Sequence, residues 1–231
     1  MNQFSATECI RFGWATFKRR GWSLVGMTAL MLVLSWVIAG IAGVLGTRDL
    51  GGFLGAIVNI ALSTLLSMGF TAVMLKANDM LDSVEVGDLW HPKPFWHFLA
   101  TAIALWLIIG LPYLALALLQ VPPVVLILLA IPALVVSLVF GFAFYLVVDK
   151  ELSALAALKE SARITRGHRV QIFLLMLAMI GINIVGLVAL FIGLFVTIPV
   201  TVLAMVHAYR TLSGTLEAAP AESIDTPEEE A

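Results

Sequence analysis

Long runs without a charged residue alternate with short charged segments along the chain. Four such runs, each 22–25 residues long, cover 22–46, 51–75, 98–119 and 124–148. A fifth run, 170–209, is 40 residues long and has glycines between 186 and 193, where the chain can reverse. About 20 apolar residues cross the roughly 30 Å of a bilayer core. The pattern therefore predicts six membrane-spanning helices, with the last two inside the fifth run.

The composition agrees with this pattern and limits the class of protein. The chain of 231 residues is 61% hydrophobic and 12% charged, and its mean hydropathy is +1.04. This leaves too little polar surface to cover a water-soluble domain. The formal net charge of −2 gives no reason to expect a nucleic-acid partner. We expect an all-α polytopic membrane protein with six transmembrane helices.

The basic residues predict the orientation of these helices. When the six spans are threaded through a membrane, 12 of the 13 Lys and Arg residues fall on one side, and only Arg48 falls on the other. Lys and Arg are enriched in cytoplasmic loops. Both termini should therefore be cytoplasmic, in a multi-pass protein of a bacterial inner (plasma) membrane.

The segment 5–20, which precedes the first span, has the pattern of an amphipathic helix. Apolar and aromatic side chains recur on one face at i, i+4 and i+7, and a basic cluster follows next to the membrane. This predicts a helix that lies on the membrane surface and contacts anionic lipid headgroups. The alternative is a cap that packs on the helix bundle. The candidate membrane contacts are Ile10, Trp14, Phe17, Lys18, Arg19 and Arg20.

Each pair of spans follows a charged segment, and the spacing is nearly regular. We interpret the integral membrane domain, 1–212, as three copies of a surface helix and a transmembrane hairpin, at 5–75, 76–148 and 149–212. The start of the third copy, 149–169, is similar to 5–20, and amphipathic interfacial helices are expected on the cytoplasmic side. The acidic, proline-containing tail 213–231 cannot bury a core and should be disordered in the cytoplasm.

A stripe of small and polar residues runs along the second span. Its five members recur every four residues, at Gly55, Asn59, Ser63, Ser67 and Thr71. In lipid, helices associate through small residues and interhelical hydrogen bonds. We therefore favour a helix-packing seam, in which Asn183 on the fifth span is the candidate partner of Asn59. The wall of a path for a solute is the alternative.

The spans offer little chemistry. An ionisable residue inside a bilayer indicates function by default, but only His207, near the end of the last span, lies within a run. Pro112, Pro132 and Pro199 fall inside the third, fourth and sixth spans, where each removes an amide donor and should bend its helix. We predict no catalytic residues, no cofactor and no metal site.

The second half of the chain resembles a known group of proteins. A span that ends in Val-Val-Asp (147–149) precedes Ala-Leu-Lys-Glu-Ser (157–161), and a last span containing Pro199 ends in Ala-Tyr-Arg (208–210). These words resemble a broad set of uncharacterised bacterial polytopic membrane proteins. They are also similar to the membrane domain attached to some glycerophosphodiester phosphodiesterases. The resemblance covers about 140–212 and implies a membrane module of unknown activity, from which no catalytic residue can be carried over.

These observations predict a non-enzymatic integral membrane protein that acts as an accessory or organising module in the envelope. Its expected partners are the lipid bilayer and anionic lipid headgroups, with a membrane-protein partner or a second copy of the chain as further candidates. The alternative is a transporter or channel for a small neutral or lipid-like solute, which would use the stripe of the second span and the proline bends. An enzyme is a third reading, but one that would need acid, base or metal ligands within the spans.

Overall fold

The computed structural model describes residues 5–45, 49–79, 86–90, 93–188 and 193–214. In this part of the chain every regular element is a helix. Six stretches are long and apolar enough to cross a membrane, and they agree with the predicted spans to within a few residues at most ends. They are Gly21–Val44, Gly52–Asp79, Phe95–Leu118, Val124–Lys150, Arg169–Val188 and Leu194–Ser213. The predicted all-α, six-span fold is confirmed.

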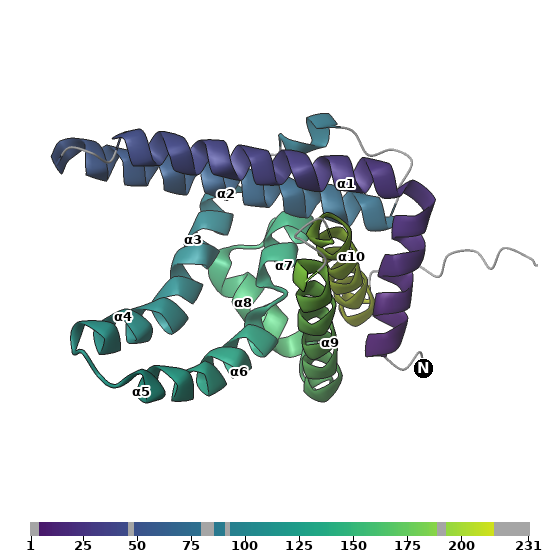
Figure 1. The fold of residues 1–231 in the computed structure, drawn as a ribbon. Helices are drawn as coiled ribbons and strands as arrows, with labels where there is room; N and C mark the ends of the chain where they lie inside the picture. Colours follow the sequence, from purple (N-terminus) through teal and green to yellow (C-terminus); the bar gives the residue numbers. More distant parts are fainter. Residues whose placement is uncertain (1–4, 46–48, 80–85, 91–92, 189–192, 215–231) are drawn as a thin grey trace, which may run out of the picture.

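The first hairpin is formed by α1 (Ala6–Leu45) and α2 (Asp49–Asp79). The helix α1 includes both the segment 5–20 and the first span, and its ribbon turns sharply between these two parts (Figure 1). The part of α1 that follows the turn runs alongside α2, while its N-terminal part packs on α10 (Leu194–Ser213). One continuous helix therefore combines the predicted surface segment with the first span.

The third and fourth spans are interrupted near their prolines. The third span consists of α3 (Phe95–Leu105), a π-helical turn (Trp106–Gly110) and α4 (Leu111–Leu118). The fourth consists of α5 (Pro123–Leu128), α6 (Ala130–Phe140) and α7 (Ala143–Lys150). Proline has no N–H for the carbonyl four residues earlier, and these carbonyls belong to Ile108 and Leu128. Pro112 and Pro132 thus account for the π-helical turn and for the break between α5 and α6. The break between α6 and α7, at Gly141 and Phe142, has no proline, and α10 continues through Pro199.

The third hairpin begins with α8 (Ala154–Ile164), which leads into α9 (Arg169–Val188) and then α10. The reversal predicted between 186 and 193 depends on two glycines that lie against each other. A Cβ atom on Gly193 would lie 2.5 Å from the carbonyl oxygen of Gly186. Only glycine permits this approach of the two helix ends.

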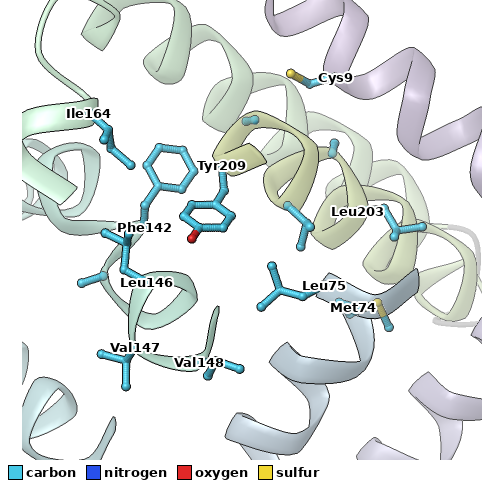
Figure 2. Close-up of a cluster of buried hydrophobic side chains, with 14 of the residues drawn as sticks. Cys9, Met74, Leu75, Phe142, Leu146, Val147, Val148, Ile164, Leu203 and Tyr209 are labelled. Atoms are coloured by element: carbon cyan, nitrogen blue, oxygen red, sulfur yellow. The ribbon is translucent and has the colours of Figure 1, made fainter. Parts of the chain in front are cut away.

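The hydrophobic core lies near one end of the bundle, where charged residues gather at the ends of the helices. We call this end of the bundle, which comprises residues 76–79, 149–151, 163–169 and 210, the charged end. The buried side chains of the core come from α1, α2, α3, α7, α8, α9 and α10, and Figure 2 shows some of them. Phe142, Leu146, Leu203 and Tyr209 are among the largest side chains that are fully buried. At their other ends the hairpins diverge, and their outward apolar side chains are exposed, as expected for lipid-facing helices (Figure 1).

The helix α8 departs from the interpretation of 149–169 as a second membrane-surface helix. Its apolar face is largely covered, although Leu155 is 63% exposed. Ala157, Leu158 and Ile164 are buried, and the buried Ser161 hydroxyl donates a 2.8 Å hydrogen bond to the carbonyl of Val139. The amphipathic pattern is real, but its apolar side packs on α3, α6 and α7 instead of on lipid.

The proposed threefold division into 5–75, 76–148 and 149–212 stays a prediction. Each of the three segments does contain one helical hairpin of the structure. Beyond Gly214, the tail 213–231 lies outside the described residues.

Candidate functional site

A groove of about 910 Å³ lies within the membrane-spanning part of the structure, between α2 on one side and α3 and α7 on the other. The π-helical turn contributes Trp106 to its wall. Ligand sites in proteins usually have volumes of about 300–1,000 Å³. The groove is therefore large enough for a small molecule or for part of a lipid.

The wall that α2 contributes is polar. Four of the five stripe residues, Asn59, Ser63, Ser67 and Thr71, line the groove together with Thr64. Gly55, the fifth, is buried and is not part of the lining. With 3.6 residues per turn, each step of four residues advances by about 40° around the helix. The stripe therefore rotates away from the groove toward its Gly55 end.

The polar groups of this wall are partly satisfied within α2. Ser63 Oγ donates to Asn59 Oδ1 over 3.4 Å, and Thr71 Oγ1 donates to the carbonyl of Ser67 over 2.8 Å. A hydroxyl that donates in this way keeps lone pairs that accept a hydrogen bond. The hydroxyls of Ser63 and Thr71 can therefore accept hydrogen bonds from a molecule in the groove while they donate within α2.

The opposite wall is apolar and aromatic. Phe98, Ala102 and Trp106 line it from the third span, and Phe144 and Tyr145 line it from α7. The rings of Phe98 and Phe144 pack with centroids 4.8 Å apart. No Asp, Glu, Lys or Arg belongs to the lining formed by the described residues. The groove thus has one hydrogen-bonding wall, one apolar wall and no formal charge.

The predicted pairing of Asn59 with Asn183 is not what the structure shows. Asn183 lies on α9 and donates to the carbonyl of Met179 over 2.9 Å and to Thr201 Oγ1 of α10 over 3.3 Å. These bonds join the two helices of the third hairpin. Asn59 instead lines the groove on α2.

The aromatic wall of the groove connects with an ionic cluster at the charged end. Tyr145 stacks on Tyr209 with ring centroids 5.7 Å apart, and the Tyr209 hydroxyl donates a 2.5 Å hydrogen bond to Asp149. Arg210 Nη1 donates to the same carboxylate over 2.7 Å, and Arg210 Nε donates to Asp79 over 3.1 Å. We call Asp79, Asp149, Tyr209 and Arg210 the Arg210 clasp.

The Arg210 clasp joins the ends of α2, α7 and α10, one helix from each hairpin. The side chains of Arg210 and Asp149 are only 11% and 16% exposed, whereas that of Asp79 is 41% exposed. Charged groups removed from water must be paired. Two motifs noted in the sequence, Val-Val-Asp and Ala-Tyr-Arg, contact each other here, but nothing in their spacing along the chain indicated this contact.

A further ion pair joins the end of α2 to the 3₁₀ turn Val86–Leu89. Lys76 binds both carboxylate oxygens of Asp88 at 2.9 and 2.8 Å. Beside it, the 3₁₀ turn Val86–Leu89 lies so close to α2 that a Cβ on Gly69 would overlap the carbonyl of Leu89. This turn therefore packs directly on α2 at the charged end.

The predicted membrane contacts on 5–20 lie beside a face that the sequence analysis did not identify. Ala6, Cys9, Gly13 and Thr16 form this face, and it packs the N-terminal part of α1 on α10. Trp14 is exposed, with Lys18 Nζ 5.7 Å from its ring centroid, and Ile10 and Phe17 are half-buried. Arg19 is exposed, while the side chain of Arg20 lies outside the described residues. Lipid contact by these residues stays a prediction, and the packing of the neighbouring face agrees with the alternative of a bundle cap.

Of the histidines and carboxylates that the structure describes, none lines the groove. Within the described ranges, no group of three His, Cys, Asp or Glu residues lies close enough to hold a metal ion. His207 stacks on Phe12 of α1 with ring centroids 4.0 Å apart, which joins the N-terminal part of α1 to α10. The structure therefore brings polar, uncharged groups together in the groove and charged groups together in the Arg210 clasp.

The comparison with known families concerns the second half of the chain. Residues 115–215 match the model of a family described as "Protein of unknown function (DUF975)". None of the curated proteins and none of the solved structures compared with the chain matches it. The similarity to the membrane domain of glycerophosphodiester phosphodiesterases stays a prediction. The chain is a multi-span membrane protein that is similar, over residues 115–215, to a family of unknown function.

Proposed function

We propose that this protein is a non-enzymatic membrane module that holds a neutral, lipid-like molecule in the groove between α2, α3 and α7. The observation that carries this proposal is the pairing of a hydroxyl- and amide-bearing wall with an aromatic wall, around about 910 Å³ without a charged side chain. An amphipathic molecule matches both walls at once.

The chemistry of the lining selects the class of molecule. A charged group in the middle of a membrane is costly unless a partner neutralises it. The groove offers hydroxyls and one amide, which favour hydroxyl or ester groups of a neutral molecule. The rings of Phe98, Phe144 and Trp106 favour an acyl or isoprenoid chain, because aromatic side chains bury large apolar areas. A monoacylglycerol has both features and serves as a probe.

Such a module could act in two ways in the envelope. As an accessory protein, it would bind the lipid and present it to a membrane-protein partner or to a second copy of the chain. A transporter for a small neutral or lipid-like solute is the second candidate. The π-helical turn Trp106–Gly110 in the groove wall favours it, since interrupted helices in transporters expose backbone groups at the substrate site. Movement of a short-chain fluorescent monoacylglycerol across proteoliposomes would favour the transporter.

Binding of a radiolabelled monoacylglycerol to the purified protein in detergent tests the groove. Ala102 lines the groove on α3, and Ala100, two residues earlier, is exposed on nearly the opposite face. We expect Ala102→Trp to weaken binding by about tenfold or more, because a misplaced large side chain costs roughly 1–3 kcal/mol. Ala100→Trp is the matched control and should bind like the parent.

The same experiment distinguishes the groove from a helix-packing seam. Ser63→Leu should weaken binding but leave the melting temperature close to that of the parent, since Ser63 faces the groove. A seam predicts a lower melting temperature and no effect on the ligand. Equal binding by the parent, Ala102→Trp and Ser63→Leu would overturn the proposed function.

We further propose a bacterial inner-membrane location with both termini in the cytoplasm. The support is the excess of Lys and Arg on the charged end, including Lys76, Lys150 and Arg210. Fusions of a reporter to Met1 and to Ala231 test this orientation. A reporter that is active only in the cytoplasm should function at both ends, and a periplasmic reporter that functions at either end would contradict it.

A further inference from the structure

The turn between α8 and α9 forms a second hollow, at the charged end of the bundle. It has a volume of about 330 Å³ and is lined by Arg166, Gly167, Arg169 and Val170. Gly167 has φ = +90°, a conformation that favours glycine. The side chains of both arginines are exposed at this turn.

The backbone of this turn is fixed by hydrogen bonds to the C-terminal end of α8. Thr165 is fully buried, and its hydroxyl donates a 2.9 Å hydrogen bond to the carbonyl of Ser161. The amides of Arg166 and His168 donate to the carbonyls of Arg163 and Thr165, each over 3.2 Å. Because α8 packs in the core, the two arginines project from a fixed support and not from a mobile loop.

The charges around the turn are unevenly neutralised. Arg163 is paired with Glu160 through two hydrogen bonds of 2.7 and 2.6 Å. This pairing lowers the pKa of Glu160. Among the residues that the structure describes, no acidic side chain forms an ion pair with Arg166 or Arg169. The hollow therefore keeps two positive charges for an anion.

The surface next to the hollow indicates where the anion comes from. Val170, Leu174 and Leu177 follow at i, i+4 and i+7 on α9, and Val170 is 72% exposed. These side chains belong to a membrane span and form an apolar stripe that begins at the two arginines. An anionic group bound by Arg166 and Arg169 would thus have its hydrocarbon chains next to this stripe.

We propose that Arg166 and Arg169 bind the phosphate of an anionic phospholipid headgroup, with the acyl chains along Val170, Leu174 and Leu177. Guanidinium groups bind phosphate oxygens in a bidentate manner. A free phosphate ion would use the same two groups but would gain nothing from the apolar stripe. This site is separate from the groove and does not depend on the proposed function.

Lipid binding to the full-length protein in detergent, measured by native mass spectrometry, tests the proposal. The parent should bind phosphatidylglycerol more tightly than phosphatidylcholine with the same chains. The double variant Arg166→Gln/Arg169→Gln should lose about tenfold or more of this preference, since each basic residue near an anionic surface adds to the attraction of anionic lipid. The matched control Lys159→Gln/Arg163→Gln removes the same charge from exposed positions of α8 and should keep the preference for phosphatidylglycerol.

Three further measurements separate phospholipid binding from simple charge attraction, from binding of free phosphate and from binding in the groove. Arg166→Lys/Arg169→Lys keeps the charge but not the bidentate geometry, and it should retain part of the preference. Inorganic phosphate, added at constant ionic strength, should not displace the lipid, and Ala102→Trp should not change the preference. Three results would overturn the site: no preference in the parent, equal losses in the two Gln double variants, or displacement by inorganic phosphate.

Discussion

Replacing Asp149 with alanine should lower the stability of the protein by about 3 kcal/mol, because it leaves the mostly buried guanidinium of Arg210 without its better-buried partner. Tyr209 also loses its hydrogen-bond acceptor. For a chain of this size, this corresponds to a decrease of roughly 6–12 °C in the apparent melting temperature. Thermal unfolding in a mild detergent, followed by intrinsic fluorescence, measures it.

Asp79→Ala is the matched control for this prediction. Asp79 binds the same arginine, but its side chain is 41% exposed. Ion pairs close to water contribute only about 0–1 kcal/mol, so the decrease should be less than half of that for Asp149→Ala. Equal effects of the two substitutions would show that the Arg210 clasp does not depend on the burial of Asp149.

The six spans could be predicted from the sequence because their cause is local. A charge-free run of sufficient length is stable in a bilayer whatever its neighbours are. The π-helical turn in the third span and the break between α5 and α6 in the fourth have local causes as well. Pro112 and Pro132 remove particular helix hydrogen bonds, and the interruptions lie where those bonds would be.

The contacts between helices were harder to predict. The sequence contains many small residues in its spans, and few of them contact another helix. Ala39 and Gly43 on the first span have the spacing of a packing motif, yet nothing lies within 4 Å of where a Cβ of Gly43 would be. Gly13 and Gly69 do make close contacts. Spacing along one helix does not indicate which face the other helices cover.

The groove and the burial of α8 share this limitation. The sequence identified the stripe on α2 and the amphipathic pattern of 149–169. Which surface each one meets depends on elements that are distant in the chain: α3 and α7 for the stripe, and α3, α6 and α7 for α8. An apolar face packs against protein as well as against lipid, so the pattern alone could not distinguish a core helix from a membrane-surface helix.

Gly13→Leu should be among the most destabilising substitutions in the chain. A Cβ at Gly13 would overlap the carbonyl oxygen of Val200 and lie 3.1 Å from the amide nitrogen of Ala204. Both atoms belong to the backbone of α10 and cannot rotate away, so α1 and α10 must separate. We expect a loss of about 3 kcal/mol, at the upper end of the usual cost of overpacking, or roughly 6–12 °C in melting temperature.

Gly26→Leu is the matched control, since Gly26 also lies in α1 and nothing lies within 4 Å of where its Cβ would be. It should melt at the temperature of the parent or slightly above, because leucine has a higher helix propensity than glycine.

Cys9 gives a second measurement, since it is buried on the face that contains Gly13. Burial, together with the nearby Glu8, raises the pKa of its thiol to about 12. A thiolate is needed for reaction with a maleimide, so the parent should label slowly at neutral pH and Gly13→Leu rapidly. If Gly13→Leu melts like Gly26→Leu and leaves Cys9 protected, the N-terminal part of α1 does not pack on α10 through Gly13.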